Sequence, residues 1–302
     1  MLNAIKKWIS ASRAMYASTI VLPCIAGGVA AWFNGFFAWE PFLLAVIALF
    51  FANIGTNFTN DYFDYKSGVD ALDEGRKFKA GSEVLLKTGF KPHVVLASAL
   101  SCLTITAAIG LYLVFAIDWR IILFGLAGIF LAFFYTAPPF KLGYRGLSEV
   151  ACWIGNGLLP ITGTYFVLSG QWSAMAVMLS IPIGLLVTAI IYIGNVPDAE
   201  ADAKVGKKTT SVRLGRKAVV VLGPIYYIII YLSIVIGSVA GLLPLWTLLA
   251  LLTIPLTIRL LQRTSKYYND IPQYVPAIMM TVQVFMLTTV LTVIGLVVAN
   301  VI

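Results

Sequence analysis

Long apolar runs alternate with short polar stretches along this chain of 302 residues. Each run is close to the roughly 20 apolar residues that a helix needs to cross a bilayer. The pattern therefore predicts an all-α, polytopic membrane protein whose helices form a bundle. Nine spans are expected, at approximately residues 14–34, 41–60, 92–116, 119–137, 147–168, 173–194, 217–240, 242–261 and 276–300.

The composition argues against a soluble protein. Hydrophobic residues make up 60% of the chain and charged residues only 11%, whereas a soluble surface needs far more charge. No nucleic-acid-binding motif is present, and the three cysteines form no CxxC pair, so neither a zinc site nor a disulfide framework is expected. We expect one integral-membrane domain over residues 1–302, in which residues 1–12 form a short interfacial helix.

The distribution of basic residues predicts how the helices cross the membrane. All but one of the 21 Lys and Arg residues precede the first span or fall in the even-numbered connections, and Arg120 alone lies on the other side. Cytoplasmic loops carry such an excess of positive charge. The protein is therefore expected in the cell membrane, with a cytoplasmic N-terminus and an external C-terminus. The net charge of +8 follows from this topology and requires no acidic partner.

A polar stretch closes the second apolar run. Asn57, Asn60, Asp61 and Asp64 are spaced i, i+3, i+4 and i+7, which would place two amides and two carboxylates on one helix face. Charged groups are costly near hydrocarbon and are kept where they have partners or a task. Because neighbouring carboxylates repel each other, a hard divalent cation such as Mg2+ is a suitable partner. An ordinary polar loop that caps the helix is the alternative interpretation.

A second stretch repeats this arrangement at the end of the sixth apolar run. Asn195, Asp198 and Asp202 are spaced i, i+3 and i+7, about 135 residues after the first stretch. Four helices separate the two, so both Asp-rich connections, expected at about 57–91 and 195–216, emerge on the same cytoplasmic face. We therefore expect a parallel internal repeat whose carboxylates face each other at the mouth of the bundle.

Basic residues accompany the acidic ones in the same connections. One interpretation is a set of surface ion pairs, which contribute little. The other is a diphosphate site, in which carboxylates hold Mg2+ while nearby cations bind phosphate oxygens. Four carboxylates in two groups suit two metal ions, and a diphosphate with an apolar tail in the bilayer would be a polyprenyl diphosphate. The cations concerned are Lys66, Lys141, Arg145, Lys207 and Lys208.

Three ordered motifs resemble those of the UbiA superfamily of intramembrane prenyltransferases. The two Asn/Asp stretches are similar to the versions in its 1,4-dihydroxy-2-naphthoate branch, which serves the menaquinone pathway, and the second continues to Arg213-Leu214-Gly215 as that branch does. The segment from Tyr135 to Leu147 is similar to the family's third cytoplasmic connection. The chain departs from the family at Gly68, where many members have an aspartate, and Asp70 is a candidate substitute there. A further departure is Ser148, which stands where the branch often has glycine.

The resemblance implies nine helices around a central cavity and a membrane enzyme with an active site open to the cytoplasm. Its partners would be a polyprenyl diphosphate, an aromatic acceptor and the lipid bilayer, and its cofactor would be Mg2+, as two ions. Ionisation of the diphosphate gives an allylic cation, which an electron-rich ring carbon attacks and which aromatic faces shelter. The implied metal ligands and catalytic residues are Asp61, Asp64, Asp198 and Asp202, with Lys141 and Tyr135. The implied substrate-binding residues are Arg13, Asn57, Asn60, Lys66, Arg145, Asn195 and Lys207.

The acceptor and the reaction class leave alternatives open. The resemblance favours 1,4-dihydroxy-2-naphthoate, whose prenylation accompanies loss of the ring carboxylate. 4-Hydroxybenzoate and a prenylated glycerol phosphate of archaeal lipid synthesis are the alternatives. A cation-coupled transporter is a more distant one, because transporter sites lie near the bilayer midplane, whereas these carboxylates are expected at helix ends.

Overall fold

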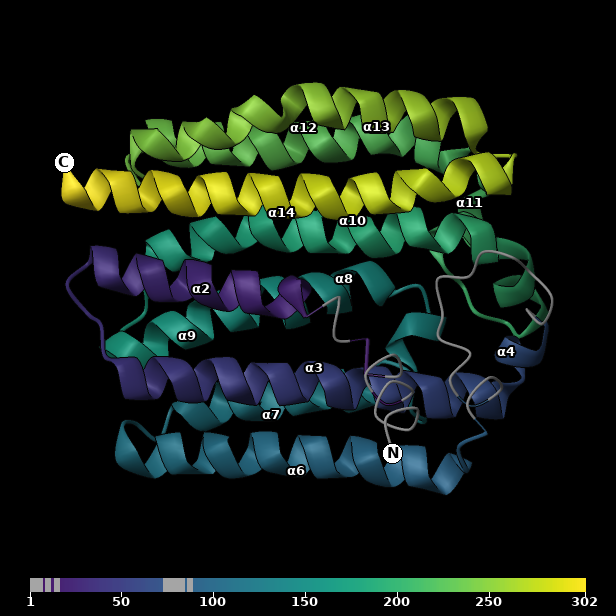
Figure 1. Ribbon diagram of the computed structural model, residues 1–302, viewed down its shortest axis with the longest axis horizontal. Helices are drawn as coiled ribbons and strands as arrows, with labels where there is room; N and C mark the ends of the chain where they lie inside the picture. Colours follow the sequence, from purple (N-terminus) through teal and green to yellow (C-terminus); the bar gives the residue numbers. More distant parts are fainter. Residues whose placement is uncertain (1–7, 9–11, 14–16, 73–84, 86–88) are drawn as a thin grey trace.

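The computed structural model describes residues 8, 12–13, 17–72, 85 and 89–302, and its regular elements are all helical (Figure 1). The expected interfacial helix at residues 1–12 lies outside the described residues except at Trp8 and Ser12, as does the side chain of Asp70. The elements are α2 (Ser18–Phe33), α3 (Trp39–Ser67), α4 (Val69–Leu72), α6 (Pro92–Ala116), α7 (Ile121–Phe134), η2 (Leu142–Tyr144), α8 (Ser148–Trp153), η3 (Ile154–Leu158), α9 (Leu159–Ser169), α10 (Ala174–Lys204), α11 (Thr210–Leu214), α12 (Ala218–Val239), η4 (Leu245–Thr253), α13 (Ile254–Tyr267) and α14 (Ile271–Val301).

Seven helical segments in the described part of the chain are long and apolar enough to cross a membrane. Two of them are composite, because α8, η3 and α9 run on as one segment and η4 continues into α13. Two shorter apolar helices, α2 with 16 residues and α7 with 14, coincide with the first and fourth expected spans. The multi-span membrane character is therefore confirmed.

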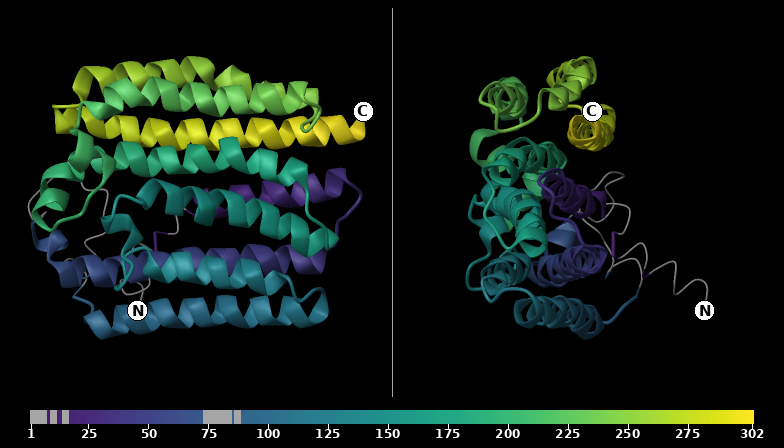
Figure 2. Two further views of the ribbon diagram at one scale, coloured as in Figure 1. Left: turned by 180° about the vertical axis from the view of Figure 1, so that it is seen from behind. Right: turned by 90° about the vertical axis from the view of Figure 1, so that its left-hand side faces the viewer.

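The long helices lie side by side, with α10 in the middle of the bundle (Figure 1). Seen along the helices, α12, α13 and α14 gather at one edge and α6 lies at the opposite edge (Figure 2). The largest buried cluster follows α10 and includes Leu179, Ile183 and Leu186, which are at most 1% exposed. The outward face is apolar as well, for example at Phe115 and Val239, which are 87% and 77% exposed. A bundle that is apolar both inside and outside suits a lipid environment.

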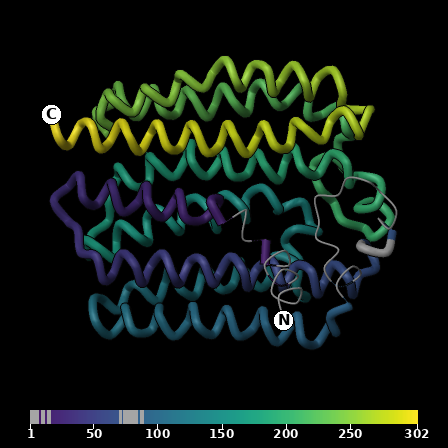
Figure 3. Tube along the Cα trace, in the orientation of Figure 1, coloured from purple at the N-terminus to yellow at the C-terminus, as the bar shows by residue number. Residues whose placement is uncertain are grey.

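The chain path brings three polar segments to one end of the bundle (Figure 3). Helices α3 and α10 run in the same direction and both end opposite the C-terminus, where the connection from α7 to α8 also lies (Figures 1 and 3). The expectation that both acidic stretches emerge at one face is therefore met by the fold.

The two acidic stretches are helical, as their spacing predicts, but the connections begin later than the expected residues 57 and 195. Helix α3 continues through Asp64 to Ser67 and ends at Gly68, whose φ of 81° lies in the left-handed region that glycine adopts without strain. Helix α10 continues to Lys204 through Pro197. Proline has no N–H, so it cannot bond to the carbonyl of Ile193 four residues earlier. The hydroxyl of Tyr274 in α14 donates to that carbonyl instead, at 3.1 Å.

Candidate active site

Three segments far apart in the sequence meet at the polar end of the bundle: the last turns of α3, the connection around η2 and the residues after α10. The hydroxyl of Tyr144 in η2 donates to Oδ1 of Asp64 in α3 at 2.7 Å. The backbone N–H of Lys208 donates to the carbonyl of Tyr144 at 2.8 Å. These contacts place residues of both acidic motifs and of the connection between them around one site.

Asp61 is the most deeply buried carboxylate of the first motif. Its side chain is 1% exposed, and Oδ1 lies 2.5 Å from a guanidinium nitrogen of Arg13. Arg13 has a φ of 52°, an uncommon conformation for a residue with a side chain. The amide of Asn57 donates to the carbonyl of the adjacent Ser12 at 3.1 Å. Asn57 thus anchors the backbone that brings Arg13 to the carboxylate.

Asp64 and Asn60 attach α3 to the connection that follows α7. The Tyr144 hydroxyl that donates to Asp64 also lies 2.9 Å from Oγ of Ser67, one turn further along α3. The side-chain oxygen of Asn60 accepts from the hydroxyl of Thr136 at 3.0 Å. Burial and the neighbouring Asp64 raise the pKa of the Tyr144 hydroxyl well above its usual range. The hydroxyl therefore stays protonated and acts as a donor.

The second motif supplies its own cation. Nζ of Lys207 lies 3.4 Å from Oδ1 of Asp202, whose side chain is 2% exposed. Burial lowers the pKa of Lys207, but Asp64, Asp202 and Asp198 together raise it above its ordinary value. Carboxylates from both motifs thus act on one ammonium group, which keeps its charge.

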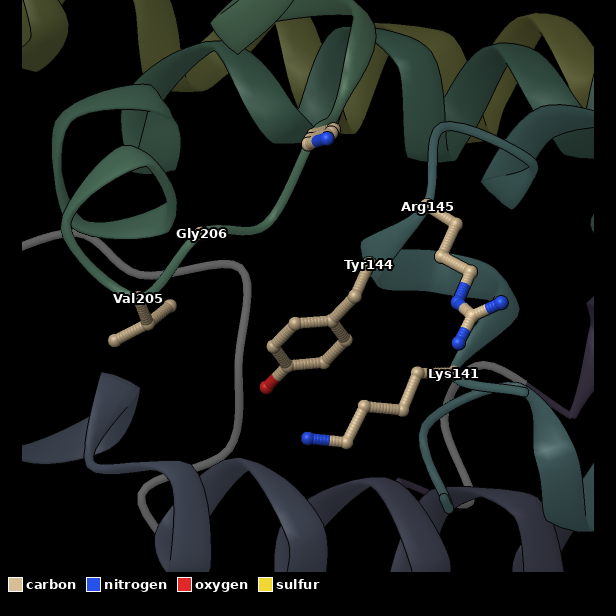
Figure 4. Close-up of a pocket in the computed structure, with 6 residues that line it drawn as sticks. Lys141, Tyr144, Arg145, Val205 and Gly206 are labelled. Atoms are coloured by element: carbon tan, nitrogen blue, oxygen red, sulfur yellow. The ribbon is translucent and has the colours of Figure 1, made fainter. Parts of the chain in front are cut away.

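Cations gather beside these carboxylates. Nζ of Lys141 and Nζ of Lys207 each lie 5.4 Å from the ring centroid of Tyr144, within the range of a cation–π contact. Next to this ring is a pocket of about 470 Å3, in which three cationic side chains and no carboxylate take part (Figure 4). Such a lining suits a phosphate or another oxyanion. The lining residues are Lys141, Tyr144, Arg145, Val205, Gly206 and Lys208.

The other expected site residues differ in how closely they approach this pocket. Tyr135 is half-buried, and its ring lies so close to Gly143 that a Cβ there would come within 2.9 Å of it. Arg145 lines the pocket and donates to the carbonyl of Pro139 at 2.9 Å. Lys66 is exposed, with Nζ 6.0 Å from the Tyr62 ring, and is not one of the lining residues.

Asn195 is half-buried on α10, one turn before Asp198. It therefore lies on the acidic face of the second motif, as Asn57 and Asn60 lie on that of the first.

Sequence reasoning did not single out Tyr144 or Glu149 as site residues. Both stand in or directly after the motif that begins at Tyr135, but nothing in the pattern indicates which partner each side chain reaches. One oxygen of Glu149 accepts from Ser148 and the other from Thr210, both at 2.6 Å. Glu149 thus fastens α11 to the start of α8, and Ser148, where the family often has glycine, takes part in that contact.

The residues present fit a hard divalent cation. All candidate ligands are oxygen donors, and the ammonium of Lys207, which pairs with Asp202 at 3.4 Å, also feels the charges of Asp64 and Asp198. No three acidic, His or Cys side chains of the described residues form a ready-made metal cluster. Mg2+ is commonly held by one or two carboxylates together with substrate phosphates. Asp61, Asp64, Asp198 and Asp202 are the residues that would hold it.

The fold and this site together define a polytopic membrane enzyme whose polar chemistry is confined to one end of an apolar bundle. Because the carboxylates lie in the last turns of α3 and α10 and not at their middles, the site does not resemble that of a cation-coupled transporter.

Comparison with known proteins identifies the family. Residues 20–275 match the UbiA prenyltransferase family, so the chain belongs to it and is a prenyltransferase. The chain is 31% identical over 274 residues to a 2-carboxy-1,4-naphthoquinone phytyltransferase of Synechocystis, covering 88% of this chain and 84% of the relative. It is 27% identical over 234 residues to the 1,4-dihydroxy-2-naphthoate octaprenyltransferase of Bacillus subtilis, covering 78% and 74%.

A solved structure shares the fold. It is a UbiA homolog from Archaeoglobus fulgidus bound to DMAPP and Mg2+, with a TM-score of 0.63 and 19% identity over 95% of this chain and 99% of that one.

Proposed function

We propose that this enzyme transfers a polyprenyl group from its diphosphate to 1,4-dihydroxy-2-naphthoate, on the route to menaquinone. The observation that carries the proposal is that Lys207 links the two motifs beside a pocket lined by cations: it pairs with Asp202 and lies against the Tyr144 ring, whose hydroxyl donates to Asp64. This arrangement suits a diphosphate head that arrives with metal. The acceptor is supported by the names of the two relatives, both of which act on naphthoate derivatives.

In this proposal, the carboxylates and the cations have separate tasks. Asp61, Asp64, Asp198 and Asp202 hold two Mg2+ ions, and when bound these ions would neutralise the oxygens of the diphosphate. Lys207 and Lys141, whose ammonium groups each lie 5.4 Å from the Tyr144 ring centroid, bind the diphosphate, while Arg145 and Lys208 line the space beside it. Arg13 neutralises Asp61 and keeps the first motif in place.

The site residues then favour cleavage of the prenyl diphosphate and attack by the aromatic ring of the acceptor. The bond between C1 of the prenyl chain and the diphosphate oxygen breaks, and the electron pair leaves with the diphosphate toward the lysines. A ring carbon of the acceptor forms the new bond to C1, and with a naphthoate acceptor the ring carboxylate leaves as CO2. Tyr135, whose ring packs against Gly143 in the same connection, is the aromatic side chain that would shelter the allylic cation.

We also propose how the chain crosses the membrane. The seven long apolar segments would make nine crossings together with α2 and α7. The excess of Lys and Arg at the end that carries Asp64 and Asp198 is typical of the cytoplasmic side. The N-terminus and the active site would then face the cytoplasm, and the C-terminus would lie outside.

Incubation of the purified full chain with Mg2+, a labelled polyprenyl diphosphate and each acceptor in turn tests the proposal. We expect a prenylated product with dihydroxynaphthoate, together with release of label from a carboxyl-labelled acceptor. Asp64→Ala and Asp198→Ala should each lose at least about 100-fold in turnover, because each removes a charge that the metal–diphosphate head requires.

Asp118→Asn is the matched control, because this carboxylate pairs with Arg120 in the connection between α6 and α7 at the other end of the bundle. Undiminished turnover in both alanine variants would refute the metal site. Turnover with 4-hydroxybenzoate or a prenylated glycerol phosphate alone would refute the acceptor and leave the reaction class standing.

A further inference from the structure

Tyr144 contacts all three segments that make up the site. Its hydroxyl donates to Oδ1 of Asp64 at 2.7 Å and lies 2.9 Å from Oγ of Ser67. The ammonium groups of Lys141 and Lys207 each lie 5.4 Å from its ring centroid. The residue is only 7% exposed. One side chain therefore touches a carboxylate of the first motif and a cation from each of the other two segments.

The backbone on both sides holds this ring in place. The carbonyl of Tyr144 accepts from the N–H of Lys208, and its own N–H donates to the carbonyl of Lys141, both at 2.8 Å. Lys141 has a φ of 46°, a left-handed conformation that a residue with a side chain adopts only where surrounding structure enforces it. These contacts fix the backbone of Tyr144, and the hydrogen bonds of its hydroxyl with Asp64 and Ser67 hold the side chain.

The hydroxyl and the ring can act on different parts of the substrate complex. A carboxylate that accepts one hydrogen bond at Oδ1 keeps lone pairs for a cation. Hydrogen bonds to ligating carboxylates orient them toward the metal, and their removal typically weakens metal binding by about 10- to 100-fold. The ring, by contrast, contacts the two lysines and not the carboxylate.

We propose that Tyr144 is a positioning residue with two separable actions: its hydroxyl orients Asp64 for the metal, and its ring holds Lys141 and Lys207 for the diphosphate. The inference rests on the proposed function, because it assigns Asp64 to the metal. Tyr144→Phe removes the first action and keeps the second. Tyr144→Leu removes both.

The test measures metal binding and turnover in the full chain. Binding of Mn2+, used as a spectroscopic substitute for Mg2+, is followed by electron paramagnetic resonance in the presence of a saturating, unreactive prenyl thiodiphosphate. We expect Tyr144→Phe to weaken Mn2+ binding and to raise the half-maximal Mg2+ concentration by about 10- to 100-fold. Turnover at saturating Mg2+ and the KM for prenyl diphosphate should stay within about threefold of the parent, because the ring remains.

Tyr144→Leu should raise the KM for prenyl diphosphate as well. Tyr65→Phe is the matched control, since Tyr65 is adjacent to Asp64 but is exposed on α3. It should leave every parameter unchanged. An unchanged Mn2+ affinity in Tyr144→Phe overturns the inference, even if its melting temperature falls, because a merely structural role would lower stability alone.

A double variant separates loss of the orienting hydrogen bond from a general effect of Tyr144→Phe on the fold. In an Asp64→Asn background the hydroxyl has no carboxylate to orient, so Tyr144→Phe should weaken Mn2+ binding no further. A further loss of the same size as in the parent overturns the inference. If the parent transfers no prenyl group but Tyr144→Phe still weakens Mn2+ binding, the proposed function fails and the orienting role stands.

Discussion

The carboxylates at the two acidic helix ends obtain their partners from different parts of the chain. In α3, Asp61 pairs with Arg13, 48 positions away, and Asp64 accepts from Tyr144, 80 positions away. In α10, Asp202 pairs with Lys207, five positions further along the same chain segment. The first motif therefore depends on the assembled bundle, whereas the second carries much of its own neutralisation.

The two ion pairs also differ in length, and the pair formed by the distant partner is the shorter one. Both carboxylates are almost fully buried, but the Arg13–Asp61 contact measures 2.5 Å and the Lys207–Asp202 contact 3.4 Å. A guanidinium holds a carboxylate through a rigid fork, whereas an ammonium is a point charge on a flexible stem. Arg13 is thus suited to a permanent structural contact, and Lys207 is free to exchange its carboxylate for an arriving phosphate.

The largest effect on stability should come from removal of the distant partner. Arg13→Ala leaves the carboxylate of Asp61 buried without its guanidinium, which typically costs about 3 kcal/mol. Thermal unfolding in detergent at pH 7 should show a clear fall in melting temperature, and Arg13→Lys should recover part of it. A melting temperature equal to the parent's would mean that Asp61 does not depend on Arg13.

The second-largest effect on stability is expected from the hydrogen bonds of Glu149, which hold α11, the helix after α10, against the start of α8. Glu149→Ala removes the acceptor of two hydrogen bonds, from Ser148 and Thr210. Bonds to a charged group contribute about 1.5–3 kcal/mol each, although Ser148 is adjacent in sequence and contributes less. We expect Glu149→Ala to lose about 2 kcal/mol by thermal unfolding and Thr210→Val to lose most of that amount. Equal stabilities for all three proteins would show that α11 is held by other contacts.

Removal of Lys207, the partner close to Asp202 in the chain, should affect substrate binding more than folding. Lys207→Met should raise the KM for prenyl diphosphate by about tenfold, which corresponds to about 1.4 kcal/mol. The melting temperature should fall less than in Arg13→Ala. Steady-state kinetics at saturating Mg2+ measure the first quantity and thermal unfolding the second. If Lys207→Met destabilised the protein as much as Arg13→Ala does, the distinction between a structural Arg13 and a substrate-binding Lys207 would be wrong.

The smallest effect is expected at the far end of the bundle. Hydrogen bonds from Arg120 lower the pKa of Asp118 to about 2, below the value of roughly 3.9 expected for an unfolded chain. The stability that this carboxylate contributes is therefore present above the unfolded value and is lost as the pH falls through about 2. The small difference in melting temperature between the parent and Asp118→Asn should be the same at pH 7 and pH 5 and smaller at about pH 3, because part of the contribution is lost between the two pKa values. A difference that is equally large at pH 5 and at about pH 3 would contradict the lowered pKa.

Much of the fold and part of the site could be predicted without coordinates. The apolar runs that predicted spans coincide with helices because burial in lipid and in the core both select apolar side chains. The boundaries of the acidic stretches were wrong, since α3 and α10 extend to Ser67 and Lys204. Helix α3 ends only at Gly68, which adopts a left-handed conformation, and in α10 the hydroxyl of Tyr274 donates to the carbonyl that Pro197 leaves without a partner in the helix.

The sequence by itself determined that two Asn/Asp motifs lie on helix ends at one face, because their spacing follows the helical repeat and an even number of spans separates them. Only the tertiary structure decided which group meets each carboxylate: Arg13 at Asp61, Tyr144 at Asp64 and Lys207 at Asp202. The physical reason is that periodicity reports which face of its own helix a residue occupies. Which side chain meets each carboxylate is set by the packing of helices and connections that are distant in the chain.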